Sequence, residues 1–434
     1  MPTPTQAREC AEQAWSWVLS QVRYDELGPW IPESVTVDGT PSPLEERYRD
    51  CTYQGLGSLA LTLDEIARYR EWTTDEKRLA NEILTRLSVA SDDSQDPGLS
   101  LGVGSHLAAM HVLGVDPVGI DRIAALATAD GWVEVENEET LICFDLLVGT
   151  AGVGLTLTWL VEVGFSATPS TTPLINLAVD TLLANAIPSA KGLQWPMYAD
   201  DTWGMMPNYS HGTAGVSAAL AICGKHLGRQ DAIDAAVAGA RHLIDIGDTS
   251  NDGFRVQTII PRGERDNEDF AYGWCHGPTG TSYLFGALEF AGIESVDGIS
   301  CDGWIARCLN AIRTSGVPTR IRPGFWDNDG RCCGTAGVLD FALDVIQRNP
   351  VDPDFTYADE LAQALVDRAI MDPALGHTYW RFTEHRREQP LLDPGVGWMQ
   401  GAAGIAGALM RYSRVRTDPA AATRQSRPEA WWMA

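Results

Sequence analysis

The stretch HGTAGVSAAL, residues 211–220, contains two glycines three positions apart, followed by a run of small and apolar residues. Clear copies of this pattern are VGTAGVGLTL (148–157), HGPTGTSYLF (276–285), CGTAGVLDFA (333–342) and QGAAGIAGAL (400–409). Two less regular copies precede them, YQGLGSLALTL (53–63) and LGVGSHLAAM (101–110). The second glycines fall at positions 57, 104, 152, 215, 280, 337 and 404, so neighbouring copies are 47 to 67 residues apart. This spacing indicates a repeat architecture with room for two helices in each copy.

The segments between the copies have helical periodicity. In RQDAIDAAVAGARHLIDIGD (229–248), apolar residues at 233, 236, 237, 240 and 244 follow the i, i+3, i+4, i+7 spacing of an amphipathic helix. The runs after the glycines are apolar or small on all sides, as in a helix that is buried all round. Alternation of the two types predicts an all-α fold, a double-layered α/α toroid of about seven helix pairs. An open helical solenoid has the same pattern, and the spacing does not distinguish the two.

Composition narrows the class of protein. The chain has 434 residues, of which 44% are hydrophobic, and 32 Lys and Arg against 58 Asp and Glu give a net charge of −26. This charge argues against nucleic acid or anionic membrane as a partner, although an acidic groove for a basic peptide stays possible. We expect no membrane span and no signal peptide. Nine cysteines in such a chain are expected to be mostly reduced, which favours a cytoplasmic location.

The residues directly before the glycine pairs are the candidates for a functional site. If all inner helices begin at one end of the ring, their unpaired N–H groups and dipole ends converge there and favour anions, including thiolates. The side chains at or near these positions are Asp145, His211, Cys275, His276, Cys332, Cys333 and Gln400. A cluster of thiols and imidazoles is the donor set that zinc prefers, and a catalytic zinc commonly has three protein ligands.

Each candidate also has a simpler structural interpretation. A buried cysteine is often only a small apolar residue, but Cys275, Cys332 and Cys333 recur at equivalent positions of two repeats, which favours metal binding. His276 is a spare ligand candidate. His211 could cap a helix, and Asp145 could accept hydrogen bonds at a helix start.

The motifs SHGTAG (210–215), GWCHGPTG (273–280) and CCGTAG (332–337) resemble those of the LanC lanthionine synthetase cyclases and their LanC-like relatives, over roughly residues 45–412. The resemblance implies a double-layered α-toroid with a central zinc ion. It implies addition of peptide cysteine thiols to dehydroalanine or dehydrobutyrine, which forms thioether rings. It also implies that Cys275, Cys332 and Cys333 are zinc ligands, that His211 is an acid or base, and that Asp145 lies in the same pocket.

Three positions differ from the pattern that is usual in this family. The chain has Cys332-Cys333-Gly where Cys-His-Gly is usual. Some members of the family carry this all-cysteine version, which is associated with more reactive zinc-bound thiolates. His276 stands where tyrosine is frequent, and Ala271 stands where some members have arginine. These differences bear on how the enolate would be stabilised, and they leave the expected metal site intact.

The resemblance also suggests how the chain is organised and what it acts on. We expect an N-terminal helical extension (1–44), a LanC-like toroid with the zinc site (45–416) and a C-terminal tail (417–434). Because no region is long enough for a dehydratase, the expected partner is a precursor peptide that a separate dehydratase has already dehydrated. Three alternatives stay open: a LanC-like protein that adds glutathione, a zinc-dependent prenyltransferase-like toroid, and a non-catalytic zinc-containing scaffold that binds peptides.

Overall fold

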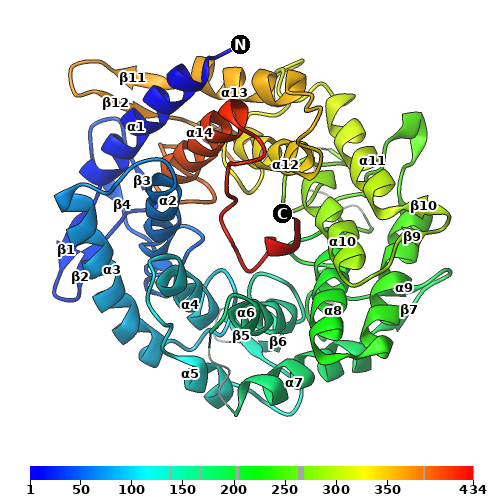
Figure 1. Ribbon diagram of the computed structural model, residues 1–434. Helices are drawn as coiled ribbons and strands as arrows, with labels where there is room; N and C mark the ends of the chain where they lie inside the picture. The colour runs from blue at the N-terminus through cyan, green and yellow to red at the C-terminus, as the bar shows by residue number, and fades with distance from the viewer. Residues whose placement is uncertain (137–138, 166–168, 201–204, 262–267, 385–386, 434) are drawn as a thin grey trace.

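The computed structural model describes residues 1–136, 139–165, 169–200, 205–261, 268–384 and 387–433. The α-helices of these residues form two concentric rings around one axis (Figure 1). The inner ring consists of α2 (Gly57–Ala67), α4 (Val103–Val112), α6 (Thr150–Glu162), α8 (Thr213–Leu227), α10 (Pro278–Phe290), α12 (Thr335–Arg348) and α14 (Ala402–Thr417). The outer ring consists of α1 (Pro4–Ser20), α3 (Thr74–Asp93), α5 (Ile120–Ala125), α7 (Thr171–Ala184), α9 (Gln230–Ile246), α11 (Cys301–Arg313) and α13 (Thr356–Arg368).

The ring is closed. Each inner helix packs against the next along the chain, and the last one, α14, packs against both α12 and the first one, α2. Each inner helix is also backed by an outer helix, and α14 is backed by α1 from the opposite end of the chain. This closure excludes an open solenoid and confirms the toroid of seven helix pairs that the glycine repeat predicts.

The two rings differ in burial as their sequences predict. In α10, every residue from Pro278 to Leu288 is buried, because α8, α12, α11 and the centre of the ring surround it. In α9, Ala236, Ala240 and Leu243 are buried, whereas Asp234 and Arg241 on the other face are exposed. The apolar face of the outer helix therefore packs inward on the inner ring.

The glycine repeat has a steric cause. A Cβ atom on Gly215 would lie under 3.0 Å from the carbonyl oxygen of Tyr209, six residues earlier, and Gly337 has the same relation to Arg331. Gly152, Gly280 and Gly404 are constrained in the same way. The loop before each of these helices folds back over the helix start so closely that no side chain fits there.

The same loops also accept hydrogen bonds from the first N–H groups of the inner helices. In α12, the N–H groups of Thr335, Ala336 and Gly337 donate to carbonyl oxygens seven residues earlier, and α6 and α14 begin with the same pattern. The expectation that unpaired N–H groups gather at this end of the ring is therefore wrong for these helices. Because the loop carbonyls already accept these hydrogen bonds, an anion there must be held by side chains.

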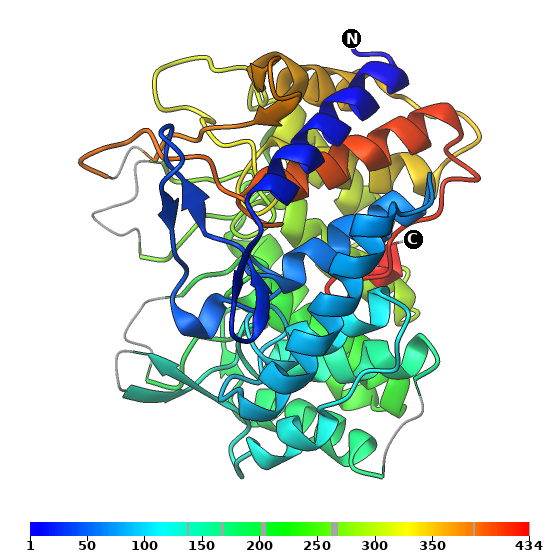
Figure 2. The same cartoon turned by 90° about the vertical axis from the view of Figure 1, so that its left-hand side faces the viewer.

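Short hairpins connect the helices. The described strands form two-stranded antiparallel sheets: β1 (Arg23–Asp25) with β2 (Gly28–Trp30), β3 (Ser34–Val35) with β4 (Pro41–Ser42), β5 (Val133–Glu136) with β6 (Glu139–Ile142), β7 (Ile187–Pro188) with β8 (Leu193–Gln194), β9 (Ser295–Val296) with β10 (Ile299–Ser300), and β11 (Ile370–Asp372) with β12 (His377–Tyr379). In the side view, the β5–β6 hairpin lies on one side of the ring and the C-terminal residues lie on the other (Figure 2). Among the described residues, no helix has both the length and the apolar character needed to cross a membrane.

Candidate metal centre

The loops that precede the inner helices are joined to one another at one end of the ring, which we call the mouth. A circle of backbone hydrogen bonds links neighbouring loops. With the N–H donor given first, it runs from Tyr53 to Ser100, Ser100 to Leu147, Leu146 to Ser210, Ser210 to Cys275, Cys275 to Cys332, Cys332 to Met399, and Met399 back to Tyr53. The circle fixes the position of each loop relative to its neighbours, and two of the cysteines are members of it.

Three thiols meet inside this circle. The Sγ atoms of Cys275, Cys332 and Cys333 all lie within 4.8 Å of one another, and those of Cys275 and Cys333 are 3.2 Å apart. Cys275 and Cys332 are buried, Cys333 is half-buried, and all three are free thiols. Cys275 comes from the loop before α10, and the paired cysteines come from the loop before α12. We call these three residues the thiol cluster.

The three thiols of the cluster shift one another's pKa values. Hydrogen bonds from Cys275 and Cys332 lower the pKa of Cys333 well below the usual thiol value, and the charge of His276 acts in the same direction. The pKa of Cys275 is raised well above its usual value, first by its hydrogen bonds with Cys332 and Cys333 and then by burial. The pKa of Cys332 is also raised. Each thiol therefore shifts the pKa of the other two, as their close approach requires.

His211 and Asp145 form a second pair at the mouth. His211 Nδ1 and Asp145 Oδ2 are 2.6 Å apart, and the Asp145 side chain is fully buried. The other carboxylate oxygen, Oδ1, accepts hydrogen bonds from the N–H groups of Val148 at 2.9 Å and Gly149 at 2.8 Å. Asp145 thus holds the turn before α6 and orients the imidazole at the same time. Gly212, and not His211, is the N-cap residue of α8.

Two further side chains connect the pair and the cluster. The ring centroids of His211 and His276 are 5.5 Å apart, and the charge of His276 also acts on Cys333, so His276 lies near both groups. Gln400 donates from Nε2 to Cys333 Sγ at 3.5 Å. The structure thus brings all seven side chains that the sequence indicated to one mouth: Asp145, His211, Cys275, His276, Cys332, Cys333 and Gln400.

Tyr53 is a site residue that the sequence reasoning missed. Burial raises its pKa well above the usual tyrosine value, and negative charge on Cys332, Cys333 and Cys275 raises it further, so its hydroxyl lies beside the cluster. The signal was present in the repeat. Tyr53 stands four residues before the second glycine of its copy, the same offset as Cys333, His211, His276 and Gln400 in theirs.

The donor set fits a thiophilic metal ion. In the part of the chain that the structure describes, the thiol cluster is the one group of at least three His, Cys, Asp or Glu side chains placed to hold a metal. Three sulfurs without a carboxylate match the ligands that zinc takes and do not match those of magnesium or calcium. The group contains no fourth ligand from a described residue, which is typical of a metal with an open position.

Comparisons with known structures support the fold. The structure is similar to nisin cyclase, with a TM-score of 0.55 and 12% sequence identity over 85% of this chain and 89% of that one. It also matches a D-mannose isomerase, with a TM-score of 0.48 and 13% identity over 95% of this chain and 99% of that one. At such low identity, the first similarity shows a shared fold, and the second adds no argument.

Sequence comparison gives the family. Among curated protein sequences, none matches this chain significantly. The family model described as "Lanthionine synthetase C-like protein" matches residues 47–419, which is most of the chain. The chain therefore belongs to the lanthionine synthetase C-like family.

Proposed function

We propose that this chain is a zinc-dependent lanthipeptide cyclase. It would add cysteine thiolates of a dehydrated precursor peptide to dehydroalanine or dehydrobutyrine, forming lanthionine and methyllanthionine rings. The observation that carries the proposal is the meeting of three thiols from two loops within 4.8 Å, beside the His211–Asp145 pair. Family membership and the toroid fold support it.

Cys275, Cys332 and Cys333 would hold the zinc. When bound, zinc would supply a Lewis acid at which an incoming peptide thiol loses its proton at neutral pH. Cys333 contributes a negative charge that a neutral histidine at this position would lack. This additional charge favours a more nucleophilic peptide sulfur. Gln400 already orients Cys333 by its hydrogen bond.

His211 would move the proton. Addition forms a bond between the peptide sulfur and the β-carbon, and a proton must then reach the α-carbon. Asp145 occupies Nδ1 of His211, so Nε2 is the atom that can exchange a proton with the substrate. Imidazole is suited to this step because it gains and loses a proton near neutral pH. Asp145 would orient the ring and need not itself transfer a proton.

The partner would be a precursor peptide dehydrated by a separate enzyme, in the cytoplasm. A synthetic peptide with one dehydroalanine and one cysteine is a direct probe, and the same peptide with serine in place of dehydroalanine is its control. We expect the wild type to bind about one zinc per chain and to consume the thiol of the first peptide only. Consumption would be measured as loss of alkylation by mass spectrometry.

Two variants assign the result to the site. His211→Gln should keep the zinc and lose the acceleration, whereas Cys333→Ala should lose both. Zinc binding without any acceleration by the wild type would refute the cyclase and support a peptide-binding scaffold. A glutathione adduct in place of a ring would favour the alternative in which the chain adds glutathione.

A further inference from the structure

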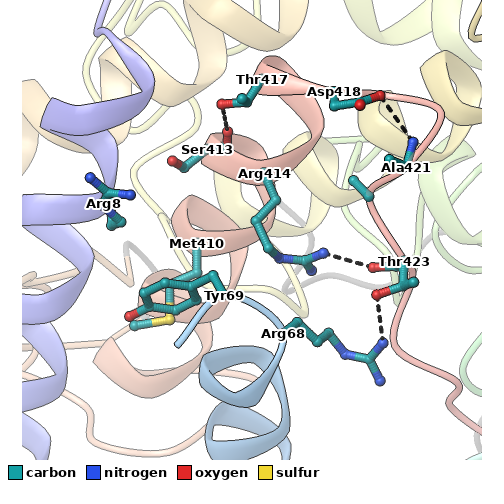
Figure 3. Close-up of a pocket in the computed structure, with 11 residues that line it drawn as sticks. Arg8, Arg68, Tyr69, Met410, Ser413, Arg414, Thr417, Asp418, Ala421 and Thr423 are labelled. Carbon is teal, nitrogen blue, oxygen red and sulfur yellow. Dashed lines mark hydrogen bonds between the residues drawn. The ribbon is translucent and has the colours of Figure 1, made fainter. Parts of the chain in front are cut away.

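The C-terminal residues beyond α14 do not lie on the outside of the ring. We call residues 418–433 the tail. Asp418 accepts a hydrogen bond from the N–H of Ala421 at 3.0 Å, which starts a turn at the end of the ring opposite the mouth. Arg414 then donates to the carbonyl oxygen of Thr423 at 2.8 Å, and Arg68 donates to its hydroxyl at 3.2 Å (Figure 3). From there the tail runs into the lumen, the space that the inner helices enclose (Figure 1).

Inside the lumen the tail is bonded to most of the inner ring. Gln425, Arg427, Trp432 and Met433 are all buried. The hydrogen bonds, donor first, are Gln425 to Leu61 of α2, Trp159 of α6 to Ser426, Tyr209 before α8 to Glu429, Trp432 to Tyr283 of α10, and Arg424 to Asp344 of α12. Residues 424–433 of the tail therefore fill the lumen as a packed part of the fold, although the family model ends at residue 419.

The tail also supplies charge that α12 needs. Asp340 and Asp344 of α12 are buried, with exposed fractions of 3% and 0%. Arg427 donates to Asp340 at 3.0 Å, and Arg424 donates to Asp344 at 2.9 Å. Arg411 of α14 contacts both carboxylates. Buried carboxylates are costly without such partners, so part of the stability of α12 depends on the tail.

The contact between Arg427 and Asp340 connects the tail with the loop that carries Cys332 and Cys333. Asp340 also accepts a hydrogen bond from Arg331, the residue directly before Cys332. Arg427 and Arg331 thus meet on the same carboxylate oxygen, Oδ2. Arg331 and Cys332 are fixed further by N–H bonds to the carbonyl oxygen of Met399, at 2.8 and 3.0 Å.

Little space is left between the tail and the mouth. Two cavities of about 30 and 20 Å³ lie there, both lined by Trp398, Met399, Arg427 and Glu429. Tyr53, beside the thiol cluster, lines the larger one. Cavities of this size hold about one water molecule each. A peptide therefore cannot reach the thiols through the lumen.

We propose that residues 424–433 are a plug that closes the lumen behind the thiol cluster, and that Arg427, through Asp340 and Arg331, is a positioning residue for Cys332 and Cys333. The plug would have two effects. It would keep reagents from reaching the thiols from behind, and it would hold α12 so that the paired cysteines of the loop before it face Cys275. The second effect rests on the metal site of the proposed function, and the first does not.

The first experiment compares the wild type with a chain that ends at Thr423, which keeps the anchoring contacts of Arg68 and Arg414. The metal-free proteins are treated with a bulky hydrophilic maleimide, and labelling of Cys275, Cys332 and Cys333 is followed by peptide mapping. We expect the shortened chain to label faster, and a synthetic peptide of residues 424–433 to restore protection. Equal labelling rates in a folded shortened chain would overturn the plug.

The second experiment uses point variants, so that it holds even if the shortened chain does not fold. Arg427→Met removes the contact with Asp340, and Arg424→Met is its matched control, because Asp344 lies one helical turn further from the cysteines. Zinc affinity is measured by competition with a chromophoric chelator. We expect Arg427→Met to weaken binding about tenfold or more, the range for groups that orient metal ligands, with Arg427→Lys restoring it.

The outcomes separate the two proposals. Equal zinc affinities for Arg427→Met and Arg424→Met would overturn the positioning role, because general destabilisation would then explain both. A wild type that binds no zinc would refute the proposed function, whereas the maleimide comparison would still decide whether the tail is a plug.

Discussion

Removing the Asp145 carboxylate should separate its structural role from its chemical one. Asp145→Ala leaves the N–H groups of Val148 and Gly149 without their acceptor in a buried site. An unsatisfied buried group costs about 1–3 kcal/mol, so the two together should lower the free energy of unfolding by about 2–6 kcal/mol. With an unfolding entropy of about 2.1 cal/mol/K per residue, a chain of 434 residues has about 0.9 kcal/mol/K. The melting temperature should therefore fall by about 2–7 °C.

Asp145→Asn should behave differently. Its amide oxygen can still accept from both N–H groups, so we expect a melting temperature within about 2 °C of the wild type. Its NH₂ group, however, would donate to His211 Nδ1, so Nδ1 must accept and the ring is held neutral with its one proton on Nε2. This disfavours the doubly protonated ring, which is the form that can act as an acid. If Nε2 of a protonated His211 supplies the proton to the substrate, turnover should fall by about 10²-fold or more.

Calorimetry, ¹⁵N NMR of the His211 tautomer and the thiol-consumption assay together test this reasoning. An Ala variant that melts within 1 °C of the wild type would show that Asp145 does not hold the start of α6. An Asn variant with the altered tautomer and undiminished turnover would show that ring orientation by Asp145 does not matter to the reaction.

Three further predictions concern the metal, the repeat and pH. Cys333→Ala should weaken zinc binding by more than the ~10–100-fold typical of losing a group that orients a ligand. Its control, Cys308→Ala, removes a buried cysteine outside the cluster and should leave zinc stoichiometry unchanged. Equal zinc content in both variants would exclude Cys333 as a ligand. Gly215→Ala should destabilise the fold by about 1–3 kcal/mol, because its Cβ would overlap the Tyr209 carbonyl oxygen, and unchanged urea unfolding would contradict this steric account. Burial lowers the pKa of His106 from 6.5 to about 4, so as pH falls the unfolded chain binds a proton before the folded chain does. The stability that His106 contributes above pH 6.5, up to about 3 kcal/mol, should therefore be lost between pH 6.5 and 4. The wild-type melting temperature should therefore fall more steeply over this window than that of His106→Phe, and parallel slopes would refute it.

Much of the fold could be predicted from the sequence because the repeat is local. The glycine pairs report a steric conflict between a helix start and the loop just before it, and the helical periodicity reports which side of each helix is buried. Each signal is contained in one helix and the loop next to it, so each copy can be interpreted alone. The same offset before the second glycine also predicts which side chains face the mouth, and it would have identified Tyr53 if applied to the first copy.

Other features depend on contacts between residues that are distant in the chain. The closure of α14 on α2, the packing of α1 on α14 and the seven-membered circle of loop hydrogen bonds each join segments that carry no local mark of their partners. The expectation of free N–H groups at the mouth failed for this reason, since only the folded loops show where those groups donate. The course of the tail is a similar case, because Arg424 and Arg427 look like ordinary surface arginines until Asp344 and Asp340 are placed beside them. The sequence by itself thus determined the repeating unit and the residues presented at the mouth. The tertiary structure decided how the ring closes and what fills it, because burial of charge and loop pairing arise only when all seven units are assembled.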